Sequence, residues 1–186
     1  MMFRSFFALR VPERVAKELA NFSDELCQFD RGLDAHWVDS TSYHLTLCFL
    51  GDVTLDQIET LERLVSNAFL GQRFSATLDR LGYYAVNPEL SVVAAMSSGD
   101  SNLTWLHETL LALSDEAGIG HRDQNFMPHV TLARLPSDNR FAENADLPPL
   151  NIQLAADSIV LFESRTVDSG SVYKPLFEIE LPRLDP

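Results

Sequence analysis

The chain has little of three features that would point to particular classes of protein. Its two cysteines, Cys27 and Cys48, have no CxxC spacing and are too few for a disulfide framework. No apolar run approaches the roughly 18–20 residues that span a bilayer. The N-terminal apolar segment is interrupted early by Arg10, with no small-residue cleavage site after it. We therefore expect a cytoplasmic protein without membrane contact, with an N-terminal strand and both cysteines in the core.

Basic residues are also scarce. Lys and Arg total 14 against 27 Asp and Glu, which gives a formal net charge of −13. This balance argues against a long basic groove for nucleic acid, because such binding depends on neutralising many phosphates. A pocket for one phosphate is still compatible with this charge. Most of the basic residues are arginine, whose planar guanidinium binds a phosphate through two hydrogen bonds, which lysine cannot do. If the substrate is a phosphoester, we expect contact with a chain end or a small molecule.

What the sequence does contain is the pattern His-x-Thr-Leu twice, at residues 44–47 and 129–132. Both copies lie in runs of β-branched and bulky apolar residues, which predict strands. Residues two apart on a strand point to the same side. His44 and Thr46 therefore share one face, as do His129 and Thr131, while the intervening apolar residues point the opposite way. Each strand can bury one side and offer an imidazole and a hydroxyl to a cleft.

A pair of histidines suits the cleavage of a phosphodiester without a metal. One group must take a proton from the attacking oxygen and another must give one to the leaving oxygen, and the histidine pKa of about 6.5 suits both tasks. The hydroxyls of Thr46 and Thr131 can hold the non-bridging oxygens. A single His-x-Thr is weak evidence, so the hypothesis depends on the repetition. The alternative is a pair of structural histidines in ordinary strands.

The remaining pattern predicts an α+β fold with a faint internal duplication. Apolar residues at helical spacing predict three helices: one from Pro12, one capped by Thr54 or Asp52, and one capped by Ser101 or Asn102. Phe69 is expected on the buried side of the second helix. Strands are expected at residues 3–9, 74–84, 90–96, 152–154, 158–164 and 172–180, and the first histidine strand should end at Gly51. Two segments, one beginning at residue 3 and the other at residue 90, each contain a strand, a helix, a loop and a histidine motif in the same order and at similar spacing. Two such β-α-β units around a pseudo-twofold axis would bring both histidines to one cleft.

The sequence resembles the two-histidine (2H) phosphoesterase superfamily, most closely the bacterial RNA 2′,3′-cyclic phosphodiesterases, also called 2′-5′ RNA ligases. The resemblance is carried, in the family's order, by residues 4–12, 37–38, 44–51, 126–134, 161–165 and Tyr173. It implies one bilobal α+β domain over residues 1–186, with two antiparallel sheets around a central cleft and helices outside. It also implies hydrolysis of 2′,3′-cyclic phosphate RNA ends to 2′-phosphate without metal or cofactor, and the reverse joining of ends through a 2′-5′ bond.

The same resemblance assigns roles to the motif residues. It makes His44 the donor of a proton to the leaving oxygen and His129 the base that activates water. Thr46 and Thr131 would grip the phosphate. Arg134 corresponds to a family arginine near the phosphate, yet strand alternation puts it on the apolar face with Val130 and Leu132. Either the strand twists or bulges there, or Arg134 is a salt-bridged structural residue.

Several neighbouring residues have more than one interpretation. Phe126 could stack on a base or lie in the core. It follows Gln124 and Asn125 where many relatives have Arg-Pro, and residues 89–95 lack an arginine and a tryptophan that many relatives carry, so two nucleotide contacts are missing. The other histidines are expected on the surface or a helix face: His36, His107 and His121. No His-x-His or Asp-x-Asp accompanies either motif, so we expect no metal site.

We therefore expect a monomeric enzyme that acts on RNA 3′ ends or small cyclic nucleotides. One alternative is a non-catalytic module that binds a nucleotide or an RNA end. The other is a two-histidine enzyme for a different cyclic or 2′-5′ phosphodiester.

Overall fold

The computed structural model describes residues 1–31, 34–120, 125–137, 141–143 and 146–183. Within these ranges the chain forms three α-helices, an eight-stranded sheet and a two-stranded sheet, and all strand pairs are antiparallel. The predicted α+β class with two antiparallel sheets is confirmed. The elements, in chain order, are β1 (Met2–Arg10), α1 (Glu13–Leu26), β2 (His36–Trp37), β3 (His44–Thr54), α2 (Leu55–Asn67), β4 (Phe74–Leu78), β5 (Arg80–Asn87), β6 (Leu90–Met96), α3 (Ser101–Glu116), β7 (His129–Pro136), β8 (Ile152–Ala156), β9 (Ser158–Val167) and β10 (Gly170–Glu180).

The large sheet has the strand order β10-β9-β1-β3-β7-β6-β5, with the short β2 paired to β7. The two histidine strands, β3 and β7, are central neighbours. Each is flanked by the first strand of its own unit, β1 beside β3 and β6 beside β7. Between β3 and β7 themselves the ladder consists of a single pair, Leu45 with Val130. Two sheet halves therefore meet at the middle of the two His-x-Thr motifs.

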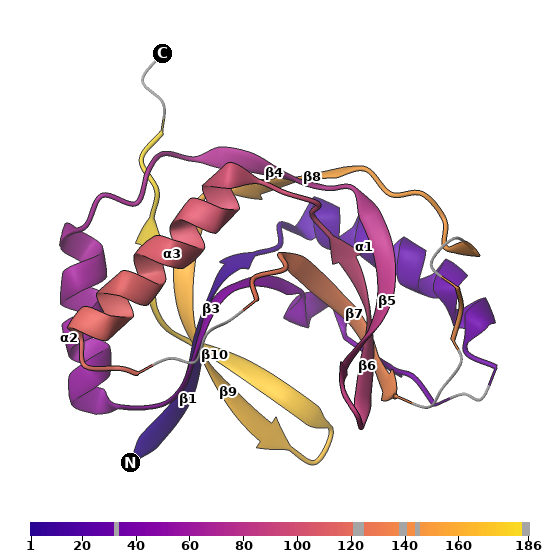
Figure 1. Ribbon diagram of the computed structural model, residues 1–186, viewed down its shortest axis with the longest axis horizontal. Helices are drawn as coiled ribbons and strands as arrows, with labels where there is room; N and C mark the ends of the chain where they lie inside the picture. Colours follow the sequence, from indigo (N-terminus) through magenta and orange to yellow (C-terminus); the bar gives the residue numbers. More distant parts are fainter. Residues whose placement is uncertain (32–33, 121–124, 138–140, 144–145, 184–186) are drawn as a thin grey trace.

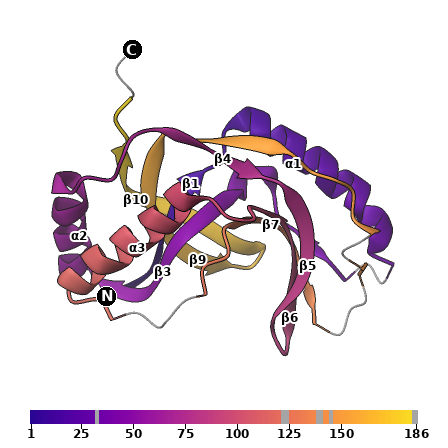
Figure 2. The same ribbon diagram turned by 45° about the horizontal axis from the view of Figure 1, so that its top comes forward.

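The helices cover this sheet from its two ends. In Figures 1 and 2, α2 and α3 lie at one end of the molecule and α1 at the other. The helices are exchanged between the units: α3, which follows β6, packs against β3, and α1, which follows β1, contacts β7. Each unit thus supplies a helix that supports the histidine strand of the other.

Capping side chains set two of the helix starts. Thr54 accepts from the Gln57 amide and the Gln57 side chain accepts from the Thr54 amide, a reciprocal cap that begins α2. Asp100 caps α3 by accepting from two backbone amides, which corrects the predicted cap at Ser101 or Asn102. Gly51 takes a positive φ of 74° without ending β3, which continues to Thr54 and corrects the predicted end. Phe69 is 75% exposed rather than buried, because α2 has already ended at Asn67.

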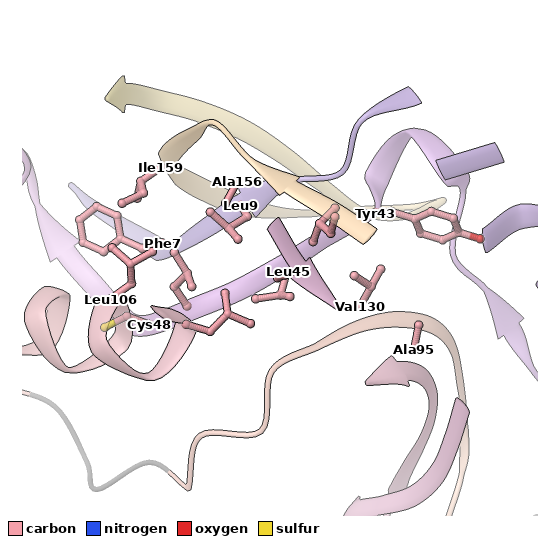
Figure 3. Close-up of a cluster of buried hydrophobic side chains, with 14 of the residues drawn as sticks. Phe7, Leu9, Tyr43, Leu45, Cys48, Ala95, Leu106, Val130, Ala156 and Ile159 are labelled. Carbon is pink, nitrogen blue, oxygen red and sulfur yellow. The ribbon is translucent and has the colours of Figure 1, made fainter. Parts of the chain in front are cut away.

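Alternation along β1 separates two apolar clusters. Phe7 and Leu9 point into the main core, where Figure 3 shows them with Leu45 and Val130 from the histidine strands and Leu106 from α3. Full burial of each such side chain contributes roughly 1.5–3 kcal/mol. The opposite face of β1 holds a smaller cluster of Phe6, Ala8, Val160 and Phe162. This second cluster lies on the side of the sheet where the histidines point.

The two cysteines have different environments. Cys48 is buried in the core as predicted, whereas Cys27 is exposed at the end of α1, which corrects its predicted place. A helix capable of crossing a membrane is not found among the described residues.

Candidate active site

The pairing of β3 with β7 places both motifs on one face of the sheet. Because Leu45 lies opposite Val130, the antiparallel register puts His44 opposite Thr131 and Thr46 opposite His129. The two histidines are then diagonal neighbours, a relation that separates residues by about 7–8 Å in a regular ladder. Leu45 and Val130 are fully buried on the core side. The pseudo-twofold relation therefore brings two imidazoles and two hydroxyls together on one face of the sheet.

Each histidine strand has a β-bulge directly after its motif. In β3 the register with β1 skips Leu47, and in β7 the register with β6 skips Leu132. The extra residue shifts the alternation of side chains by one position. In β3, Cys48 is therefore buried and Phe49 points to the cleft side. In β7, Ala133 is buried and Arg134 points to the cleft side. A bulge is one of the alternatives that the sequence leaves open for Arg134. No carboxylate partner for Arg134 occurs among the described ion pairs.

The bulges leave backbone carbonyls that need donors from outside the ladder. The Leu47 carbonyl accepts from Nδ1–H of His107 on α3, at 2.5 Å, and the Leu132 carbonyl accepts from the Val38 amide, at 2.8 Å. Of its two predicted places, the surface and a helix face, His107 takes the second: it is on the buried face of α3 and only 5% exposed. Its ring stacks on Phe126, with centroids 4.2 Å apart and an interplanar angle of 3°. Helix α3 thus fixes the shape of the first histidine strand.

Both motif histidines are held in the same tautomer. Nδ1–H of His44 donates to the Ser42 carbonyl at 2.9 Å, and Nδ1–H of His129 donates to the Met127 carbonyl at 2.6 Å. A carbonyl can only accept, so in the neutral ring the lone pair is on Nε2. The Tyr84 hydroxyl lies 3.3 Å from Nε2 of His129 and donates to it. This is the form that a general base requires.

Burial and positive charge lower the pKa of both rings. The pKa of His44 falls to about 4, mainly through burial, with further lowering by the charges of Arg134 and His129. Its ring is surrounded by Phe6, Phe162 and Tyr173, with centroids between 4.7 and 6.3 Å away. Burial also lowers the pKa of His129, and Arg134 adds to the effect. Both rings are therefore neutral at pH 7, and binding of an anion would raise both pKa values.

A cavity of about 460 Å³ lies over these residues. Its lining includes His44, both motif threonines, Arg134 and, further along β1, Arg4. No described lining residue is acidic, although the whole chain carries a net charge of −13. Arg134 also donates to the Tyr173 hydroxyl at 3.3 Å. The local excess of cations and hydroxyls is suited to an anion of the size of a nucleotide.

The predicted site residues are not all at this cavity. His44, Thr46, Thr131 and Arg134 line it, while His129 is not among the described lining residues but lowers the pKa of His44 by its charge. Phe126 instead packs on His107 and borders none of the described cavities. His121 lies outside the described residues. His36 lines a separate, smaller cavity of about 140 Å³ beside Arg134.

Three residues near the site lie outside the two His-x-Thr-Leu motifs. Tyr84 reaches His129 from β5, and Phe49 and Arg4 enter the cavity from β3 and β1. Phe49 could be found only by knowing that a bulge follows the motif, and Tyr84 only by knowing the register of β5 with β6. A place for a metal is also not evident: in the described part of the chain, no three His, Cys, Asp or Glu side chains gather closely enough to hold an ion.

An antiparallel fold that sets two His-x-Thr pairs on one face of a sheet, beside a cavity lined by cations and hydroxyls, is typical of the class of two-histidine phosphoesterases. The model of the family described as LigT-like phosphoesterase matches residues 9–90. An RNA 2′,3′-cyclic phosphodiesterase of Thermotoga maritima is 30% identical over 182 residues, covering 95% of each chain.

Solved structures show the same fold. A protein of Thermus thermophilus is 27% identical, with a TM-score of 0.76, and the match covers 97% of this chain and 98% of that one. The apo form of Escherichia coli LigT is 23% identical, with a TM-score of 0.79 over 98% and 99% of the two chains. The chain belongs to the LigT-like phosphoesterase family.

Proposed function

We propose that this protein hydrolyses the 2′,3′-cyclic phosphate at RNA ends to a 2′-phosphate, by acid–base catalysis between His44 and His129. The observation that carries the proposal is the single pair between Leu45 and Val130, which sets both His-x-Thr motifs on one face beside an anion-binding cavity. The curated relatives support the choice of substrate, since those with matches over most of this chain are named RNA 2′,3′-cyclic phosphodiesterase. The proposal includes action as a cytoplasmic monomer.

The proposed reaction uses one water and moves two protons. Nε2 of His129 takes a proton from water as the water oxygen attacks phosphorus. The bond between phosphorus and O3′ breaks, and Nε2–H of His44 gives its proton to O3′, which leaves a 2′-phosphate. Thr46, Thr131 and Arg134 would stabilise the charge that builds on the non-bridging oxygens. A 5′-hydroxyl in place of water would form a 2′-5′ bond by the same steps.

One contact distinguishes the two rings and supports His129 as the base. The Tyr84 hydroxyl donates to Nε2 of His129, and a donor at that atom favours the neutral ring that a base must be. The pKa of His44 is about 4, so its Nε2 carries no proton at pH 7 before an anion binds. A bound phosphodiester anion offsets the charge of Arg134 and raises this pKa, so the acid would gain its proton together with the substrate.

The test is hydrolysis of adenosine 2′,3′-cyclic phosphate in EDTA, with the product resolved by chromatography. We expect turnover to 2′-AMP, without 3′-AMP, at an undiminished rate in the chelator. Binding of 2′-AMP without turnover of the cyclic substrate would favour the non-catalytic module instead. Turnover to 3′-AMP would contradict the assignment of O3′ as the leaving oxygen.

A further inference from the structure

A row of aromatic rings runs past His44 into the cavity, which is lined by two of them, Phe6 and Phe49. Phe162 and Phe6 stack with centroids 5.6 Å apart, and Phe6 and Phe49 stack with centroids 6.4 Å apart at an interplanar angle of 8°. The last ring of the row, Phe49, is 38% exposed, unlike the buried Phe6 and Phe162. The guanidinium of Arg4 lies over it, 5.2 Å from the ring centroid. The cavity therefore extends beyond the two motifs to an aromatic ring and a cation.

The bulges explain why a phenylalanine occupies this position. Phe49 and Arg134 are the third residues after the two motif threonines, and the bulges at Leu47 and Leu132 turn both to the cleft. One unit thus supplies a cation to the phosphate region, and the other supplies an aromatic ring. An aromatic ring exposed inside an anion-binding cavity is a surface on which a nucleobase can stack.

Arg4 lies too far along β1 to be part of the motif region. Ala8 is the residue of β1 that pairs with Thr46, and Arg4 precedes it by four residues on the same side. At about 3.3 Å per residue this corresponds to roughly 13 Å along the strand. Arg4 is exposed, and the described ion pairs give it no carboxylate partner. Its planar cation is therefore available for a second phosphate or for the face of a base.

We propose that Phe49 and Arg4 form a subsite for the nucleotide that precedes the cyclic-phosphate end. This inference rests on the proposed function and specifies its substrate: an oligoribonucleotide end rather than a cyclic mononucleotide. The base stacks on the exposed region of Phe49 and Arg4, and the guanidinium attracts the internucleotide phosphate. Ser164 and Thr166 of β9 line the same cavity and offer hydroxyls to the ribose. The aromatic platform for RNA is thus Phe49, and Phe126 packs against α3 instead.

The experiment compares kcat/KM for a dinucleotide that ends in a 2′,3′-cyclic phosphate with kcat/KM for the corresponding cyclic mononucleotide. Loss of one stacked base typically costs about 10- to 100-fold, so the wild-type preference for the dinucleotide should be of that size. Arg4→Ala and Phe49→Ala should each reduce this preference at least several-fold. The matched control is Arg63→Ala, which removes the same charge from an exposed position on α2, and it should keep the full preference.

The proposal would be overturned if wild-type protein had nearly equal kcat/KM for the dinucleotide and the mononucleotide. It would also be overturned if Arg4→Ala and Phe49→Ala both kept the full wild-type preference for the dinucleotide. Calorimetric titration with the 2′-phosphate-ended dinucleotide and with the nucleoside 2′-phosphate gives a second measure that needs no turnover. We expect wild-type protein to bind the dinucleotide more tightly, and Arg4→Ala to lose most of that difference. If neither cyclic substrate were hydrolysed, the proposed reaction would fail, while the titration would still decide whether the subsite exists.

Discussion

Replacement of Arg134 by methionine separates the two roles that the sequence leaves open for this residue. The bulge at Leu132 turns the guanidinium to the cleft, where its only described hydrogen bond is to the Tyr173 hydroxyl, at 3.3 Å. A hydrogen bond from a cation to a phosphate oxygen contributes about 1.5–3 kcal/mol. At 1.4 kcal/mol per tenfold, affinity for 2′-AMP should fall by about 10- to 150-fold. Loss of charge stabilisation in the transition state should lower kcat/KM by about 10²–10³-fold.

The assays are calorimetric titration of 2′-AMP, initial rates with the cyclic substrate, and urea unfolding. Because Arg134 has no described carboxylate partner, the free energy of unfolding should change by less than about 1 kcal/mol. The pKa of His44 and of His129 should rise, since the guanidinium lowers both. Arg134→Lys keeps the charge but loses the two-pronged hydrogen bonding of the guanidinium, so its affinity for 2′-AMP should lie between those of Arg134→Met and wild type. Strong destabilisation with full activity would show that Arg134 is a structural residue.

Three further predictions follow from the surroundings of the two rings. The optimum of kcat/KM should lie below pH 6.5, because burial and Arg134 lower the pKa of both histidines, and an optimum above pH 7 would contradict this. His107→Leu should cost about 2–4 kcal/mol in urea unfolding, since it removes the donor to the Leu47 carbonyl and a ring stack; a loss below about 0.5 kcal/mol would mean that the carbonyl has another donor. Tyr84→Phe removes a donor that favours neutral His129, so the limb of the kcat/KM profile that reports His129 should move upward by up to about one pH unit. An unchanged limb would show that this contact is not kept during turnover.

The fold could be predicted largely because the two units repeat the same order of elements. Most of the strands and the three helices follow from apolar spacing and turn residues. The single strand predicted at residues 74–84 is wrong: β4 ends at Leu78, and β5 begins at Arg80 in the other sheet. The starts of helices are harder to predict than their existence. Asp100 is an example, because aspartate and the serine that follows it are both common N-cap residues. Phe69 was placed wrongly because helical spacing continues past the point where α2 ends.

The site was predictable where it depends on alternation and not where it depends on register. Alternation puts each histidine beside its threonine, but it fails one residue later, where a bulge reverses the faces and brings Phe49 and Arg134 to the cleft. No local sequence pattern predicts either bulge. His107 likewise looks like an ordinary helix residue, and only the carbonyl left open at Leu47 explains its burial.

The central claim is that two imidazoles act together on one phosphorus atom. Rates of hydrolysis of a 2′,3′-cyclic phosphate by His44→Ala, His129→Ala and the double variant test it most directly. Each single change should lower kcat by about 10²–10⁴-fold, and the double variant should be little slower than the worse single variant, because the two groups work as a unit. Full activity in either single variant, or independent and additive losses in the double variant, would contradict acid–base catalysis by this pair.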